Sequence, residues 1–243
     1  RLLDVLAVEA VALRLSRKVM VCHVLRFSPM YAEVKAILDS GRIGRILSIN
    51  ALEGVGAFHH AHSYVRGKWS VTAESSPMIV AKSCHDLDIL HWLTGEDCRA
   101  VSSFGSRDYF RTENAPKDAP ARCHEGCPIN GSCAYDAEHY ATEQVKFIRE
   151  VNPLLDTPGS IRSWVRPSPW GRCVYRCDND TVDHQVVNLL FGSNITATFT
   201  MTAFARGRGI EVFGSEGTIR AGAFCKANTG ADIIVTGLDA NDG

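Results

Sequence analysis

The chain opens with two different patterns of apolar positions. Apolar side chains recur at three- and four-residue spacing from Leu2 to Leu13, which predicts a helix, and an almost wholly apolar run from Val19 to Leu25 predicts a strand. A helix that leads into such a strand is typical of a parallel sheet covered by helices. The first part of the chain is therefore expected to belong to an α/β fold.

A second helix is expected next, because Ser28 can cap it, Pro29 suits its first position and Gly41 can end it. From residue 46 the pattern becomes strand-like. Two alternating runs around Gly192-Ser193-Asn194 predict an antiparallel hairpin with one apolar face and one threonine-lined face. Strands are expected near residues 46–51, 99–104, 182–191, 195–203, 210–213 and 218–220.

One long helix is expected from Ser76 to Gly95, two residues that suit its ends as caps. Inside it, Lys82 and His85 share a face, and Asp88 lies one turn from His85. An amine, an imidazole and a carboxylate on adjacent turns have two interpretations. They indicate either a reactive cluster or a core helix whose histidine is merely hydrogen-bonded.

The composition excludes several classes of function. Among 243 residues, 45% are hydrophobic and 22% are charged, which is ordinary for a globular enzyme. A net charge of -1 gives no electrostatic case for nucleic acid or an anionic membrane surface as a partner. No apolar run approaches the roughly 20 residues that span a bilayer, and no targeting signal is visible, so a cytoplasmic location is expected.

A polar and aromatic loop is expected over residues 58–69. If it is extended, His60 and His62 lie on one side of it, with Tyr64 and Arg66 close by. The histidines could bind a metal, but no fixed helical spacing or adjacent carboxylate supports this. A wall that contacts a hydroxylated ligand is favoured, because rings cover sugar faces and polar donors fix hydroxyl groups.

An irregular insertion from about residue 106 to 180 contains a cluster of cysteines. Cys123, Cys127 and Cys133 follow the spacing Cys-x3-Cys-x5-Cys, and Cys173 and Cys177 come later. This spacing suggests a structural zinc site completed by Cys177, Cys173 or a histidine. Free thiols and a disulfide are the alternatives.

The sequence has no strand–GxGxxG–helix unit for binding a dinucleotide. Gly207-x-Gly209 with Gly214 lies in strand-like sequence and fails that test. The chain also opens on Arg1 inside a helical pattern and stops without a closing element, which predicts that it is a fragment.

Taken together, five stretches resemble the Gfo/Idh/MocA family of nicotinamide-dependent oxidoreductases. They are Val21–Pro29, Leu38–Gly44, Cys84–Asp88, Trp92–Gly95 and Ile210–Gly217. With them the match runs from about residue 1 to 222. The histidine-rich loop and the cysteine insertion resemble one subgroup of that family.

The resemblance implies a fold and a division into domains. Residues 1–27 would be the last helix and strand of a Rossmann domain that binds NAD or NADP. Residues 28–243 would form an α/β substrate domain, with a large, mostly antiparallel open sheet and helices on one face. Such a sheet commonly packs against another subunit, so a homo-oligomer is expected.

The resemblance also assigns roles to residues. His85 matches the catalytic acid/base, and Arg26 matches the residue that borders the nicotinamide. Many sugar dehydrogenases of the family carry an aspartate where this chain has Ala81, so Lys82 is expected to take part of that role. His184, on the strand that faces the helix, would contact the substrate. The expected substrate contacts also include Asp88, His60, His62, Tyr64 and Arg66.

These observations predict an NAD(P)-dependent oxidoreductase that acts on a sugar, a polyol or a related hydroxylated compound. Two alternatives remain at this point. One is a glycoside-cleaving enzyme of the same fold that keeps its cofactor bound, and the other is a non-catalytic, ligand-binding or regulatory relative.

Overall fold

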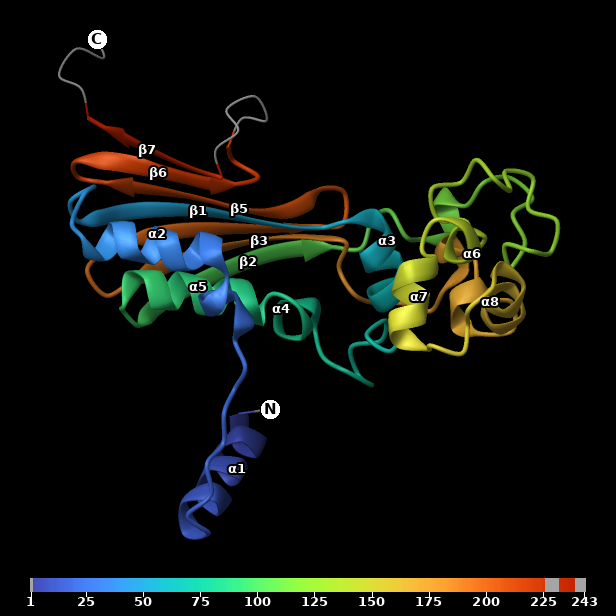
Figure 1. Cartoon of the computed structure of the whole chain (residues 1–243), viewed down its shortest axis with the longest axis horizontal. Helices are drawn as coiled ribbons and strands as arrows, with labels where there is room; N and C mark the ends of the chain where they lie inside the picture. Colours follow the sequence, from blue (N-terminus) through green and yellow to red (C-terminus); the bar gives the residue numbers. More distant parts are fainter. Residues whose placement is uncertain (1, 226–231, 239–243) are drawn as a thin grey trace.

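The computed structural model describes residues 2–225 and 232–238, and its main feature is a seven-stranded sheet (Figure 1). The strand order is β2-β3-β4-β1-β5-β6-β7. Among the described pairings only β1 with β4 is parallel, which confirms the predicted large, mostly antiparallel open sheet. The strands are β1 (Ile46–Val55), β2 (Cys98–Ser106), β3 (His184–Phe191), β4 (Thr196–Thr202), β5 (Arg206–Gly214), β6 (Gly217–Gly222) and β7 (Ile233–Gly237).

Alternation along the strands gives the sheet one buried and one open face. On β4, Ala197, Phe199 and Met201 are buried in the main core, while the threonines between them lie on the other face. The helices α2 (Pro29–Asp39) and α5 (Cys84–Thr94) cover the buried face (Figure 1). Both predicted hairpins, β3–β4 and β5–β6, are therefore confirmed, with the apolar face turned inward.

The predicted helix caps are confirmed at α2 and at the end of α5. The backbone N–H of Tyr31 donates to Ser28 Oγ over 3.4 Å, and Gly95 adopts a left-handed φ of 66°. The prediction of one unbroken helix from residue 76 to 95 is wrong. The chain forms a short α4 (Met78–Ala81), leaves helical geometry at Lys82 and Ser83, and begins again as α5. This break coincides with an ion pair that draws Lys82 toward β1.

The first 27 residues form the predicted helix but not the predicted strand. The helix α1 (Leu2–Arg14) forms but stands apart from the sheet (Figure 1), and the predicted strand at 19–25 does not form. That segment is irregular and ends in a 3₁₀ turn, Val24–Phe27. A strand needs a hydrogen-bonded neighbour, and no other described segment pairs with this one. No helix in the described ranges is long and apolar enough to cross a membrane.

The insertion gathers at one end of the sheet (Figure 1). It has one small core of its own and shares a second with Ala61, Val65 and Ala203. It contains α6 (His139–Thr142), α7 (Val145–Val151), α8 (Pro158–Val165) and 3₁₀ turns at Thr112–Asn114, Pro169–Gly171 and Val174–Arg176. The histidine-rich segment packs against it and is helical, with α3 (Ala57–His60) followed by a π-helical turn, Ala61–Val65. The predicted extended loop is therefore wrong.

Candidate functional site

His85 lies in the first turn of α5, where the helix meets the edge of the main core. Its ring is partly buried, and its Nδ1 atom is buried without a hydrogen-bond partner. The loss of water around the ring lowers the pKa of His85, and the nearby charges of Arg208, His23 and Lys82 lower it further. The imidazole is therefore neutral at neutral pH and able to accept a proton.

Four charged side chains form a continuous network beside His85. Lys82 Nζ lies 3.1 Å from Glu53 Oε1, and Arg208 Nε lies 2.7 Å from Glu53 Oε2. The same Arg208 Nε donates to Asp86 Oδ1 over 2.8 Å. Glu53 and Asp86 are almost completely buried, at 2% and 3% exposure. Two carboxylates and two cations thus tie α5 to the central strands β1 and β5.

Burial shifts the pKa of Asp86 more than its ion pair with Arg208 does. Loss of water raises the pKa of Asp86 to about 6, although the charge and hydrogen bond of Arg208 oppose that shift. Asp86 Oδ2 and the neighbouring Ser83 Oγ are buried without partners, as is His85 Nδ1. Buried polar groups are normally hydrogen-bonded. Three such atoms within four residues indicate a place where water or a polar ligand completes the hydrogen bonding.

A second ion pair fixes the other side of His85. Arg26 donates from Nε and Nη2 to the two carboxylate oxygens of Asp88, over 2.7 and 2.6 Å. His23 Nδ1 lies 2.8 Å from Asp88 Oδ1, and the His23 ring meets His85 edge-on, with 5.9 Å between centroids. Burial alone would raise the pKa of Asp88, but the hydrogen bonds and charges of Arg26 and His23 lower it. The predicted residues Arg26, Asp88, Lys82 and His85 therefore come together.

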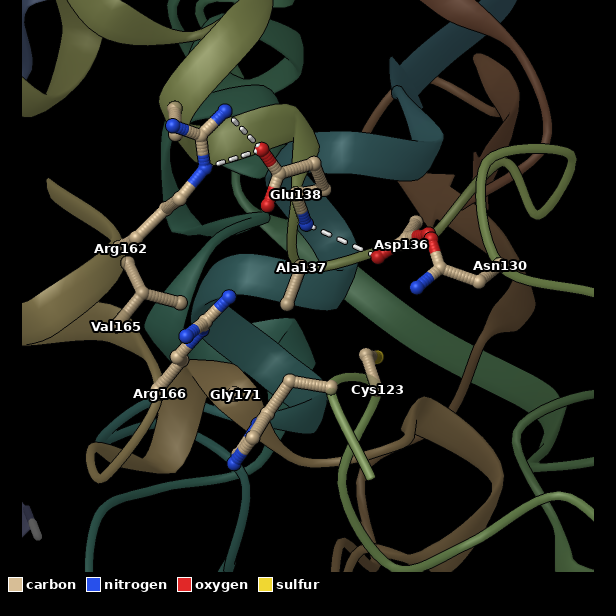
Figure 2. Close-up of a pocket in the computed structure, with 11 residues that line it drawn as sticks. Cys123, Asn130, Asp136, Ala137, Glu138, Arg162, Val165, Arg166 and Gly171 are labelled. Carbon is tan, nitrogen blue, oxygen red and sulfur yellow. Dashed lines mark hydrogen bonds and ion pairs between the residues drawn. The ribbon is translucent and has the colours of Figure 1, made fainter. Parts of the chain in front are cut away.

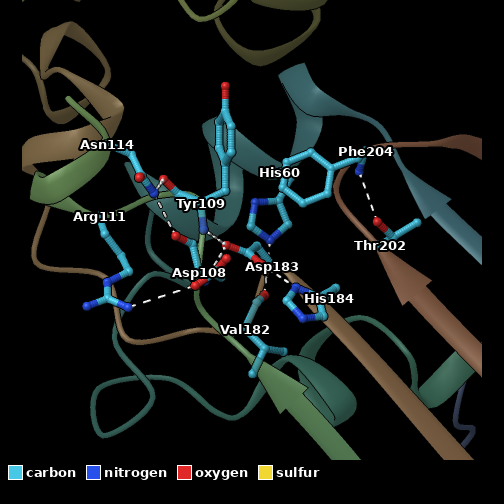
Figure 3. Close-up of polar contacts among 10 residues, drawn as sticks. All are labelled: His60, Asp108, Tyr109, Arg111, Asn114, Val182, Asp183, His184, Thr202 and Phe204. Carbon is cyan, nitrogen blue, oxygen red and sulfur yellow. Dashed lines mark hydrogen bonds and ion pairs between the residues drawn. The ribbon is translucent and has the colours of Figure 1, made fainter. Parts of the chain in front are cut away.

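The structure does not place His60 and Arg66 as an open wall for a ligand. His60 is fully buried, and its Nε2 lies 3.2 Å from the carbonyl oxygen of Val182 (Figure 3). Its ring also stacks on Phe110. Burial lowers the pKa of His60 to about 4. Arg66 is 5% exposed and donates to the carbonyl oxygens of Arg172 and Tyr135. Both side chains tie the helical turns to the insertion.

His62 and Tyr64 diverge from each other because the segment is helical. His62 Nδ1 lies 3.0 Å from the Tyr140 hydroxyl, and its ring stacks on Trp170 in the insertion. Burial lowers the pKa of His62 to about 4. Tyr64 instead lies in the main core, where burial and the charges of Glu53 and Cys84 raise its pKa to about 12. Of these two, only Tyr64 lies beside the charged network.

His184 lies on the strand β3, but on the opposite face of the sheet from His85. On β3, Val187 and Phe191 are buried in the main core, and alternation turns His184 the other way. Its Nδ1 lies 2.7 Å from Oδ1 of the buried Asp183 (Figure 3). Asp183 Oδ2 accepts from the backbone N–H groups of residues 108 and 109.

The cysteines come together, but the zinc prediction is not supported. Cys123, Cys127, Cys133 and Cys173 line one small apolar hollow, and Cys177 packs in the same cluster. Within residues 2–225 and 232–238, no three histidine, cysteine or acidic side chains are placed to hold a metal ion. Burial raises the thiol pKa values of Cys123, Cys133 and Cys177, which keeps these side chains as neutral thiols. The described cysteines are free thiols.

A polar hollow of about 100 Å³ lies elsewhere in the insertion and has no lining residue in common with the His85 site. Figure 2 shows Arg162 paired with Glu138 at its rim, with Cys123 on the other side. Asp136 accepts hydrogen bonds from the backbone N–H groups of Gly131 and Glu138. These contacts stabilise the insertion.

The sequence reasoning missed four residues of the site: His23, Glu53, Asp86 and Arg208. A signal was present for two of them. Glu53 has the same parity on β1 as the buried Ile49, and Arg208 has the same parity on β5 as the buried Ile210. A charge on the apolar side of a strand needs a buried partner, which is the pattern to look for.

With this geometry in place, comparisons with known proteins identify the class. Residues 31–220 match the model of the GFO/IDH/MocA C-terminal domain, so the chain belongs to the Gfo/Idh/MocA family. The predicted family is thereby confirmed. The chain is 22% identical over 213 residues to YteT of Bacillus subtilis, whose name gives it as a presumed oxidoreductase. It is 35% identical over 109 residues, or 45% of the chain, to inositol 2-dehydrogenase 4 of Saccharopolyspora erythraea.

Solved structures show the same fold. The scyllo-inositol dehydrogenase of Lactobacillus casei, determined with NAD(H) and scyllo-inositol, has a TM-score of 0.52 at 17% identity, covering 93% of this chain and 49% of that one. The aldose-aldose oxidoreductase of Caulobacter crescentus has a TM-score of 0.54 at 14% identity. This match covers 94% of this chain and 47% of that one. The chain spans 49% of YteT and 28% of the inositol dehydrogenase.

Proposed function

We propose that the protein is an NAD(P)-dependent oxidoreductase that moves a hydride between the nicotinamide and a sugar, a polyol or a related hydroxylated substrate. The observation that carries this proposal is His85, a neutral, partly buried imidazole with an unpartnered Nδ1 beside a charged network. The names of two relatives, an inositol dehydrogenase and a scyllo-inositol dehydrogenase, support the substrate class.

In this mechanism His85 accepts the hydroxyl proton while the substrate carbon loses its hydride, and it returns the proton in the reverse direction. Lys82 stands where it favours the neutral form of His85, and its pairing with Glu53 holds the ammonium in place. Arg26 and His23 hold Asp88 and thereby close one side of the site. The charge of Asp88 favours the imidazolium that forms when His85 accepts the proton.

A nicotinamide fits the described residues at its reacting end. The unpartnered Nδ1 of His85 marks a place for proton exchange, and Arg26 lies beside that helix. When bound, the nicotinamide supplies the hydride acceptor. The residues described here contain no glycine-rich turn of the kind that binds a pyrophosphate, so the choice between NAD and NADP does not rest on them.

The test uses the complete natural protein with NAD⁺ or NADP⁺ and a panel of inositols and hexoses. We expect net formation of NADH or NADPH, followed at 340 nm, with at least one of these compounds. Release of a sugar from a glycoside without net NADH would instead identify the glycoside-cleaving alternative. Binding of ligand without any turnover would identify a non-catalytic relative.

A further inference from the structure

The charges on the helix side of β1 and β5 do not balance. In the charged network beside His85, two cations meet two carboxylates. Arg206 adds a third cation on β5, two residues before Arg208, and it pairs across the strands with Val55, whose side chain belongs to the main core. Arg206 is therefore on the same face of the sheet as the network. Its side chain is exposed, and no residue in the described ranges pairs with it.

The other ionisable groups around the network do not supply the missing negative charge. Burial lowers the pKa of His59 and raises the pKa of Cys84, so both side chains are neutral at neutral pH. On the other side of the site, Arg26 and His23 already share Asp88, and protonation of His23 adds positive charge rather than removing it. A positive charge is therefore left over on the side where Arg206 lies.

Two glycines at the end of β1 bring Arg206 close to the start of α3. A Cβ added at Gly54 would lie 2.7 Å from the backbone nitrogen of Arg206, and one added at Gly56 would lie 3.4 Å from its Cγ. The stem of the arginine thus lies over Gly56, where α3 begins (Figure 1). Further along α3, the charges of three members of the network act on His59. This short helix therefore adjoins both Arg206 and the charged network.

We propose that Arg206 binds a carboxylate group of the substrate, so that the natural substrate is a hydroxylated acid of the sugar-acid class rather than a neutral sugar or polyol. This inference rests on the proposed function and narrows its substrate class. The carboxylate pairs with Arg206 while a hydroxyl group of the same molecule lies at His85. Arg206 is then a residue that determines specificity.

The spacing along β5 suits a substrate of this size. Arg208 donates to Asp86, the residue next to His85 in the first turn of α5. Arg206 lies about 6.6 Å further along the strand, because each residue of a strand adds about 3.3 Å. A long arginine side chain shortens the distance that the ligand must span, so a hexose-sized acid can reach both groups.

The physical reason for a carboxylate is the shape of a guanidinium group without a partner. Its N–H groups form a planar fork that binds both oxygens of one carboxylate, and such charge-assisted pairs are about twice as strong as neutral hydrogen bonds. A neutral sugar leaves the charge of Arg206 facing water, whereas a sugar acid gains an ion pair there. A phosphate group carries about two negative charges at neutral pH, so a single guanidinium matches a carboxylate better.

The experiment compares matched neutral and acidic sugars that bind to the complete protein with NADH. Isothermal titration calorimetry compares D-glucose with D-glucuronate and D-galactose with D-galacturonate, and D-glucose phosphorylated at its terminal hydroxyl is the phosphate probe. We expect at least one sugar acid to bind about tenfold more tightly than its neutral counterpart. Added NaCl should reduce this preference, because salt screens an exposed ion pair.

Two outcomes of this comparison would overturn the proposal. The first is the absence of any preference for the acid in both pairs. The second is tighter binding of the sugar phosphate than of either sugar acid, which would exclude a carboxylate as the preferred group.

Variants of Arg206 and a matched control test the assignment. Arg206→Gln should reduce the ratio of the two affinities from about tenfold to about one, because the cation is lost. Arg206→Lys keeps the charge without the planar fork and should keep part of the preference. Arg42→Gln removes another exposed arginine, four residues before β1 begins at Ile46 and without a partner in the described chain, and should leave the ratio unchanged. An unchanged ratio in Arg206→Gln would overturn the assignment.

Turnover separates this proposal from the function on which it rests. Net formation of NADH or NADPH with an inositol, together with no binding preference for acids, would overturn the proposal and leave the function standing. Binding of a sugar acid that depends on Arg206, without turnover of any compound by the natural protein, would support the assignment of Arg206 and contradict the oxidoreductase function.

Discussion

At the scale of single residues, the candidate site separates its histidine from the charges that surround it. His85 makes no ion pair, whereas Lys82 is held by Glu53 on the neighbouring strand. The ammonium therefore influences His85 through space, while Nδ1 of the imidazole is left without a hydrogen-bond partner. This arrangement makes His85 the residue whose replacement should affect the reaction most directly.

Replacement of His85 by Asn should lower kcat by about 10²- to 10⁴-fold, because the proton acceptor is lost while the side-chain volume is nearly kept. The free energy of unfolding should change by less than about 1 kcal/mol, since His85 is only partly buried. Steady-state kinetics and urea unfolding check the two parts. His91→Asn, an exposed position on the same helix, is the control. Full turnover in His85→Asn would refute the assigned role.

The rate of substrate oxidation should rise with pH and reach a plateau by neutral pH. The pKa of His85 is lowered from its ordinary value of 6.5, so the neutral base predominates above that lowered value. A pH profile of kcat/KM should therefore show an ascending limb centred below pH 6.5. A limb centred well above 6.5 would contradict the described environment of His85.

Asp86 should make the protein less stable as pH rises. Its pKa is about 6 in the folded state against an ordinary value of 3.8, so the folded protein holds a proton that the unfolded chain has already lost. The resulting stabilisation is complete below about pH 3.8 and is lost as pH rises through about 6. Asp86→Asn should remove about 1–2 kcal/mol of this pH dependence.

Urea unfolding of the natural protein and of Asp86→Asn at pH 4.5 and pH 7 measures how much Asp86 contributes to the pH dependence of stability. His60 and His62 act in the opposite direction, because their lowered pKa values favour folding as pH rises. The contribution of these histidines is the same in both proteins. It therefore cancels when the free energy of unfolding of the variant is subtracted from that of the natural protein. An identical pH dependence in the two proteins would show that Asp86 is not perturbed.

At the scale of elements, the glycine that ends α5 shows that a single residue can set where a helix stops. Gly95 ends the helix with φ at 66°, and a Cβ at this position would meet nothing within 4 Å. Substitution by Ala therefore tests backbone strain alone. Gly95→Ala should destabilise the protein by about 1 kcal/mol.

Gly159 provides the control for this prediction. It lies inside α8 without a positive φ, and its nearest neighbour for an added Cβ, Thr157 Oγ1, is 3.9 Å away. Gly159→Ala should be neutral or stabilise by up to about 1 kcal/mol, because it restricts the unfolded chain. Thermal unfolding measures both variants, and equal effects would contradict the role of the left-handed cap.

The elements that the sequence predicts well are those whose signals are local. Capping by Ser28, the glycine at 95 and the alternation from residue 195 to 203 all depend on near neighbours in the chain. The break at Lys82 could not be predicted, because its partner Glu53 is distant in sequence. The helical form of residues 57–65 likewise depends on contacts with the insertion, such as His62 with Trp170. The resemblance to the family predicts the role of His85. The charged network around His85 could be found only from the folded structure, because its members are far apart in the sequence.

At the scale of the whole molecule, the sheet leaves one broad face without helices. On this face, Thr198 lies near the centre of the sheet, on β4. Phe104 lies on the edge strand β2, and its side chain is 76% exposed. Because helices cover only the other face in the described structure, we propose, as the resemblance implies, that a second copy of the chain packs here.

Thr198→Arg should dissociate such an oligomer, because it places a long charged side chain at the centre of the proposed contact. Size-exclusion chromatography with light scattering measures the change in mass. Ala32→Arg adds the same charge at an exposed position of α2, on the helix side, and should leave the mass unchanged. A monomeric natural protein would contradict the proposed oligomer.

The parallel pairing of β1 with β4 has a consequence for how the chain folds. β1 pairs with β4 through Ser48 and Thr196, so the whole insertion lies within the loop that this contact closes. Closing so long a loop costs conformational entropy before β1 and β4 come into contact, and such non-local pairing slows folding. The core formed by residues 140–165 lies wholly within the insertion and depends on local contacts, so its early formation shortens the effective loop. Early order in the insertion should therefore raise the rate at which the sheet assembles.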